Sequence, residues 1–213
     1  MSQGRVLAVC LVHGLLPTRD TVGVSAIDKR AVAGAVKVHP LGLTGDLQAD
    51  RKNHGGPAKA VYAYAQEDAD YWSGELGRSI EPGLFGENLR LAGIDASNAV
   101  IGERWSINGV EFEVTMPRIP CGNFARHLGE SGWIRRFTAA NRPGAYLRVV
   151  KGGSVQAGDA VAVTSRPAHG VTIAQVAGGL DAAAGVRLLE AGAQELILAP
   201  QVRRAAVQAL AGA

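Results

Sequence analysis

Short runs of alternating apolar and polar residues, separated by turns, fill the first three quarters of the chain. Valine-rich segments at residues 5–13 and 33–39 are bounded by Gly or Pro, as half-buried strands are. Residues 59–65 alternate well, which places a valine on one face of a strand and two tyrosines on the other. The pattern therefore predicts a fold that is mainly β.

The strongest local signal lies at residues 104–115, where Asn108-Gly109 separates two alternating runs. Asn-Gly favours a two-residue turn whose twist matches that of paired strands, so a β-hairpin is predicted here. A last pair of strands, at 145–150 and 154–157, is expected to be joined through Gly152-Gly153.

The periodicity changes at residues 66–76, where early Glu67 and Asp68 suit the N-terminus of a helix. From Thr172 onward Ala, Leu, Val and Gln dominate, which predicts two or three short helices. The order of elements indicates a β-barrel or sandwich with flanking helices over residues 1–168. Residues 169–213 are then a small helical domain, too small to be stable unless it packs on the barrel or on a partner.

Composition and charge narrow the class of protein. The 213 residues are 47% hydrophobic and 19% charged, which is typical of a globular core and excludes a disordered chain. The net charge of +3 is spread along the chain, and this favours a small anionic ligand over nucleic acid. The apolar stretch at 6–16 is interrupted by His13 and is too short to span a bilayer, so no membrane association is expected.

Cys121 is the centre of the candidate chemistry. It follows Arg118-Ile119-Pro120, a stiff loop that could present a thiol. A thiol acts as nucleophile or metal ligand when it is ionised, and nearby cations such as Arg118 and Arg126 favour that form. The alternative is a cysteine that only fills the core. Cys10 is the other cysteine, and such sparse usage favours a reducing, cytoplasmic location.

Polar and basic residues also crowd the loop before the strand predicted at 59–65. Its glycine pair lets backbone amides approach a ligand, and its lysines would add positive charge around an anion. Its histidine and aspartate could act with them, or the loop could simply be solvated and turn the chain. The residues concerned are Asp46, Lys52, His54, Gly55, Gly56 and Lys59.

Glu87-Asn88 forms a third candidate, at the start of a predicted strand. A buried pair of this kind can orient a base or a ligand amide. It can equally satisfy backbone groups at a corner of a barrel, and the sequence favours that structural role slightly.

Taken in order, the segments GDLQAD…HGG, FGENL, PRIPC and GAYLRVV resemble the MOSC domain, named for the C-terminal domain of molybdenum cofactor sulfurase. More narrowly, they are similar to the stand-alone bacterial, YiiM-like members. The resemblance covers residues 5–165, and the segment from Thr172 resembles the short helical domain that follows MOSC in that subgroup.

The resemblance implies a MOSC-type β-barrel that binds the molybdenum cofactor (molybdopterin), with Cys121 as molybdenum ligand. It implies reduction of N-hydroxylated bases, from hydroxylamine to amine. A soft thiolate suits such a metal, and cations suit the cofactor's phosphate. The resemblance implies ligand or phosphate contacts from Lys29, Lys52, His54 and Arg118. With the loop and strand candidates described above, the expected cofactor-binding residues are Lys29, Asp46, Lys52, His54, Gly55, Gly56, Lys59, Asn88 and Arg118.

Such a reduction needs protons and electrons. His54 titrates near neutral pH and is the candidate proton donor, so it is predicted to be catalytic with Cys121. The chain has too few cysteines for an iron–sulfur cluster, and neither haem nor pyridoxal phosphate is expected. Electrons are therefore expected from a separate donor protein. The oligomeric state stays open, with a homodimer as one option.

Three other functions compete with this one. A non-catalytic carrier of the cofactor or of persulfide sulfur remains open, since the same pocket would serve it. A nucleic-acid-binding barrel is disfavoured because aromatic residues are only 5% of the chain and fall at core positions. A zinc hydrolase using His54, Cys121 and His127 lacks a CxxC or HExxH spacing.

Overall fold

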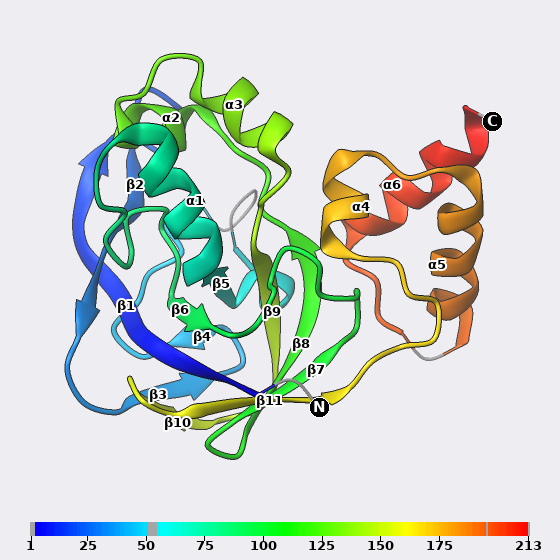
Figure 1. Ribbon diagram of the computed structural model, residues 1–213, viewed down its shortest axis with the longest axis horizontal. Helices are drawn as coiled ribbons and strands as arrows, with labels where there is room; N and C mark the ends of the chain where they lie inside the picture. Colours follow the sequence, from blue (N-terminus) through cyan, green and yellow to red (C-terminus); the bar gives the residue numbers. More distant parts are fainter. Residues whose placement is uncertain (1–2, 51–54, 195, 213) are drawn as a thin grey trace.

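The computed structural model describes residues 3–50, 55–194 and 196–212 (Figure 1). The strands are β1 (Gln3–Pro17), β2 (Val24–Val32), β3 (Val36–His39), β4 (Gly42–Leu43), β5 (Val61–Ala65), β6 (Leu89–Ala92), β7 (Arg104–Ile107), β8 (Val110–Pro117), β9 (Ala145–Lys151), β10 (Gly153–Val155) and β11 (Ala160–Ser165). The helices are α1 (Gln66–Leu76), α2 (Gly122–Leu128), α3 (Trp133–Ala140), α4 (Ile173–Gly178), α5 (Ala182–Gln194), α6 (Pro200–Ala211) and the 3-10 turn η1 (Pro57–Lys59).

Seven strands close into a barrel in the order β11-β7-β8-β9-β5-β6-β1, because β1 also pairs with β11. Their pairings are antiparallel except that of β5 with β6. The long strand β1 extends past the ring, where β2 pairs with it. The predicted fold class, a mainly β barrel with flanking helices, is confirmed.

The predicted hairpin is confirmed as β7 and β8, in which Ile107 pairs with Val110. Asn108 and Gly109 form the turn with positive φ angles of 49° and 76°. Both central residues of this tight turn need a positive φ, which Asn tolerates and Gly adopts freely.

The last two predicted strands are present and are joined at Gly152, but they do not pair with each other. The strands on either side of Gly152-Gly153 exist as β9 and β10, but they lie in different sheets. β10 pairs instead with β3, in a small sheet that continues to β4. A Cβ on Gly152 would lie 2.7 Å from the carbonyl oxygen of Val38, so this glycine allows the chain to pass close to β3.

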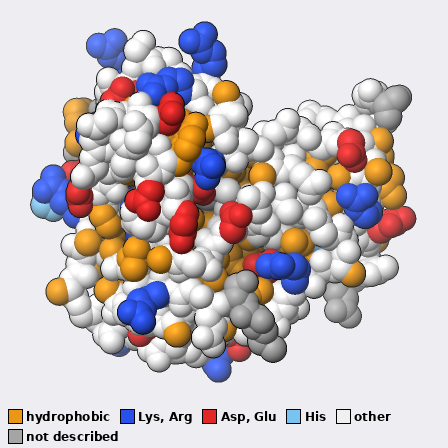
Figure 2. Space-filling view, viewed as in Figure 1, with side chains coloured by type: hydrophobic (Ala, Val, Ile, Leu, Met, Phe, Trp, Pro, Cys, Tyr) orange, Lys and Arg blue, Asp and Glu red, His pale blue; other side chains and the backbone are white. Residues whose placement is uncertain are grey.

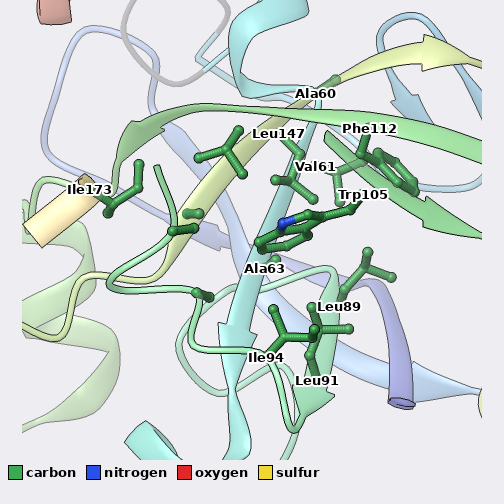
Figure 3. Close-up of a cluster of buried hydrophobic side chains, with 14 of the residues drawn as sticks. Ala60, Val61, Ala63, Leu89, Leu91, Ile94, Trp105, Phe112, Leu147 and Ile173 are labelled. Atoms are coloured by element: carbon green, nitrogen blue, oxygen red, sulfur yellow. The ribbon is translucent and has the colours of Figure 1, made fainter. Parts of the chain in front are cut away.

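The alternation in β5 separates two apolar clusters. Val61, Ala63 and Ala65 belong to the cluster inside the barrel, where Figure 3 shows Trp105 near Val61 and Ala63. Tyr62 and Tyr64 point to the outer face, which α1, α2 and α3 cover with aromatic side chains. Both faces of β5 are therefore buried. The outer cluster also holds Trp72, Phe85, Phe124, Trp133 and Phe137.

Helices α4 to α6 form a lobe beside the barrel, and the surface is indented between the two (Figures 1 and 2). Ile173, Leu188 and Val202 from these helices join the same apolar cluster as the barrel interior. The three helices are thus packed on the barrel, and the boundary at residue 168 stays a prediction. No helix in the described part of the chain has the length and apolar character needed to cross a membrane.

Candidate functional site

A cleft opens beside β2, between the loop that follows β4 and the segment that leads into α2. The empty space within it is about 720 Å³, part of which is open to solvent. Polar and aromatic side chains dominate its lining. The lining includes Lys29, Asp46, Gln48, Lys59, Tyr62, Asn88, Arg118, Cys121 and Tyr146.

Cys121 lies on the wall of this cleft, immediately before the first residue of α2, and its side chain is partly exposed. Cys10, in contrast, is fully buried in β1. The structure therefore supports a presented thiol at Cys121 and a core-filling role at Cys10. Arg126, the second cation expected near Cys121, donates instead to the side chain of Asn123.

Arg118 is the buried cation of the cleft, with only 7% of its surface exposed. Its guanidinium carbon lies 4.2 Å from the centre of the Phe124 ring and 5.1 Å from that of Tyr62. Among the described residues, no ion pair involves Arg118 and its Nε has no hydrogen-bond partner. A buried guanidinium left in this way is suited to a bound anion.

Lys29 and Asp46 form an ion pair on the wall of the cleft, with side chains 9% and 8% exposed. The carboxylate of Asp46 also accepts hydrogen bonds from the backbone N of Val12 (3.0 Å) and from Nδ2 of Asn88 (2.8 Å). Burial lowers the pKa of Lys29, and the charge of Asp46 opposes that shift. These two predicted binding residues therefore contact each other.

Asn88 and Glu87 have the structural role that the sequence favours. The side chain of Asn88 accepts a hydrogen bond from the backbone of Tyr62 (3.1 Å) and donates one to that of Cys10 (3.2 Å). Glu87 accepts from the backbone N of Gly83 (2.8 Å) and pairs with Arg90. Asn88 also lines the cleft, so it both joins strands and positions Asp46.

The turn held by Glu87 lies against the backbone of Lys29. Gly83 has a φ of +92°, and a Cβ there would lie 2.3 Å from the carbonyl oxygen of Lys29. A glycine is needed for both reasons, the positive φ and the close approach. The turn at Gly83, just before FGENL, thus packs against β2 at Lys29 and supports the position of this lysine.

The loop predicted to cradle an anion is only partly described, because Lys52 and His54 lie outside the described residues. Lys59 lines the cleft, with its Nζ 6.0 Å from the centre of the Tyr146 ring. The backbone N of Gly56 donates to Oε1 of Gln48 (2.9 Å). Gly55 and Gly56 are not among the described lining residues, so the Gly56 amide serves the loop itself.

Two tyrosines of the cleft were interpreted from sequence only as strand residues. Tyr62 in β5 and Tyr146 in β9 are cross-strand partners, and their ring centres lie 5.1 Å apart. Burial raises the pKa of both phenols. The alternating pattern places each on one face of its strand, but only the pairing of β5 with β9 brings them together.

Comparisons with known proteins found a matching family model and similar sequences. Residues 50–162 match the model of the MOSC domain. The chain is 34% identical over 149 residues to the uncharacterized protein YflK of Bacillus subtilis (strain 168), covering 70% of this chain and 67% of YflK. It is 33% identical over 156 residues to protein YiiM of Escherichia coli (strain K12), covering 72% and 69% of the two chains.

A longer relative and a solved structure extend these matches. A protein named reductase from Gibberella moniliformis (strain M3125 / FGSC 7600) is 31% identical over 149 residues, which cover 67% of this chain and 26% of that one. The crystal structure of YiiM from Geobacillus stearothermophilus matches with a TM-score of 0.77 at 23% identity, covering 97% of this chain and 99% of that one.

Proposed function

The chain belongs to the MOSC domain family, and from that premise we propose that it is a molybdenum-cofactor-dependent reductase of N-hydroxylated bases or related compounds. The proposed reaction converts a hydroxylamine to an amine. A relative named reductase supports the oxidoreductase part of this proposal. The electrons would come from a separate donor protein.

The observation that carries the proposal is that one cleft is lined by two unlike groups, the Cys121 thiol and the Arg118 guanidinium. A sulfur donor suits molybdenum, which favours soft ligands in this kind of cofactor. The unpartnered Nε of Arg118 suits an anionic group such as the cofactor's phosphate. The residues present therefore fit the molybdenum cofactor.

When bound, the cofactor would supply the two-electron chemistry that breaks the N–O bond. Cys121 would hold the metal, and Arg118 would bind an anionic oxygen through its planar fork of N–H groups. Lys59, half-buried in the cleft, would add a second positive charge. Tyr62 and Tyr146 would exclude water from the cleft, which strengthens each of these electrostatic contacts.

The test compares Cys121→Ser with Cys10→Ala, both purified from a host that makes the cofactor. Elemental analysis gives the molybdenum content, and reduction of a hydroxylaminopurine with a reduced electron donor gives the turnover. Cys121→Ser should lose both while its circular dichroism spectrum is unchanged, and Cys10→Ala should keep both. Full metal content and turnover in Cys121→Ser would contradict the proposal. A loaded wild-type protein without turnover would favour the carrier function.

A further inference from the structure

The ion pair with Asp46 distinguishes Lys29 from Arg118, the buried guanidinium of the cleft. Asp46 is fixed on three sides, by Lys29 of β2, by the backbone of Val12 in β1, and by the side chain of Asn88. Its carboxylate therefore neutralises Lys29 within the protein itself. Lys29 is then poorly suited to neutralise a phosphate, whereas Arg118 has no such described partner.

A neutralised lysine on the wall of a reducing cleft can still supply a proton. Reducing a hydroxylamine takes up two electrons and two protons and releases an amine and water. The hydroxyl oxygen must receive a proton as the N–O bond breaks, because hydroxide is a poor leaving group. A side chain held on the wall of the cleft can deliver that proton directly.

Few described groups of the cleft are suited to this step. Arg118 does not release its proton in proteins. Cys121 is assigned to the metal in the proposed function. Burial raises the pKa of Tyr62, whose hydroxyl donates to the carbonyl oxygen of Pro143 (2.8 Å). Two lysines line the described cleft, Lys29 and Lys59, and Lys29 has the more buried ammonium group, which Asp46 holds in place.

We propose that Lys29 is the proton donor of the cleft and that Asp46 is the residue that positions its ammonium group. The inference rests on the proposed reductase function. In the step, an Nζ proton passes to the leaving hydroxyl oxygen, which departs as water. Two electrons from the donor protein break the N–O bond. The nitrogen takes the second proton from solvent, and solvent then returns a proton to Lys29.

The surroundings of Lys29 support this role. Burial lowers its pKa, which makes proton release easier near neutral pH than for an exposed lysine. The charged and titratable groups that face it are Asp46 from the loop after β4, Cys10 from β1, and Arg118 from the segment after β8. Asp46 favours the protonated form and Arg118 opposes it.

The decisive variant is Lys29→Arg, because arginine can keep the ion pair with Asp46 but does not release a proton at working pH. Lys37→Arg, on an exposed position of β3, is the matched control. We expect Lys29→Arg to keep the wild-type molybdenum content and to lose about 100-fold or more in kcat. In the wild type, kcat should fall at alkaline pH as Lys29 loses its proton. Lys37→Arg should show the same fall, and the residual activity of Lys29→Arg should not.

A second measurement does not need the loaded enzyme. Carbon-13 NMR of the lysine side chains in cofactor-free protein should show a Lys29 signal that titrates below the usual lysine value of about 10.4. This signal should be absent from Lys29→Arg, whereas the signal of Lys59, whose pKa is also lowered by burial, should remain. Wild-type kcat and pH profile in Lys29→Arg would overturn the role of Lys29 and leave the proposed function standing. Absence of turnover in loaded wild-type protein would overturn both.

Discussion

The guanidinium carbon of Arg118 lies 4.2 Å from the centre of the Phe124 ring. In the sequence these two residues flank Cys121. Phe124 in turn packs against Phe85 and Trp133, with ring centres 5.3 and 5.4 Å away. Cys121 packs against this aromatic cluster and lies close enough to Arg118 to interact with its charge. This contact fixes the loop that presents the thiol, and it leaves the guanidinium at the cleft.

Replacing Arg118 by lysine should weaken anion binding although it keeps the charge. Lysine lacks the planar fork and stacks poorly on Phe124, so about 10-fold or more of the affinity for the cofactor should be lost. The measurement is the molybdenum-to-protein ratio after dialysis. Arg30→Lys, at an exposed position of β2, should keep the wild-type ratio. Equal ratios in both variants would show that Arg118 does not bind the anion.

The two cysteines should differ sharply in reactivity. Burial raises the pKa of Cys10 to about 12, and its side chain is inaccessible, so it should resist alkylation in the folded protein. Cys121 is partly exposed on the cleft and should react with iodoacetamide. Mass spectrometry of peptides, before and after denaturation, distinguishes the sites. Modification of Cys10 in the native protein at a rate equal to that of Cys121 would contradict this assignment.

Local signals in the sequence were sufficient for several elements of the fold. The bounds expected for the helix at 66–76 match α1, and the Asn108-Gly109 turn matches the hairpin of β7 and β8. Both depend on residues that are neighbours in sequence. Helices α2 and α3 were not predicted, because each is short. Their signal was an apolar pair four residues apart, Phe124 with Leu128 and Trp133 with Phe137.

The site was harder to predict than the fold. The sequence indicated Lys29, Asp46 and Arg118 as separate binding residues, but the structure pairs the first two with each other. That pairing depends on β2 and the loop after β4 lying side by side, and no local pattern specifies it. The same holds for Tyr62 and Tyr146, which meet only because β5 pairs with β9.

Removing one partner of the Glu87–Arg90 pair should destabilise the barrel strongly. Both side chains are 0% exposed, so Glu87→Gln leaves a buried guanidinium without its countercharge, at a cost of about 3–5 kcal/mol. Urea unfolding followed by circular dichroism gives the free energy of unfolding. Glu130→Gln, in the more exposed pair with Arg78, should cost less than about 1 kcal/mol. Similar losses in the two variants would contradict this difference.

The segment between β11 and α4 should make stability sensitive to acid. His169 donates from Nε2 to the carbonyl oxygen of Ile101 (2.9 Å), and its Nδ1 accepts from the backbone N of Val171 (3.0 Å). A second proton on the ring would sit on Nδ1 and point at the N–H of Val171, so the neutral ring is favoured. Burial lowers the pKa of His169, and the nearby charge of Arg187 acts in the same direction.

Because the folded pKa of His169 lies below the unfolded value of about 6.5, the unfolded chain binds more protons as the pH falls. The contribution of His169 to stability should thus be present above about pH 6.5 and be lost on acidification. Thermal unfolding at about pH 7.5 and about pH 5.5 measures this loss. His169→Gln should show a smaller difference in Tm between these conditions than wild type or His13→Gln, an exposed control. An unchanged difference would mean that protonation of His169 does not contribute, leaving His127, whose pKa is also lowered by burial, as the acid-sensitive group.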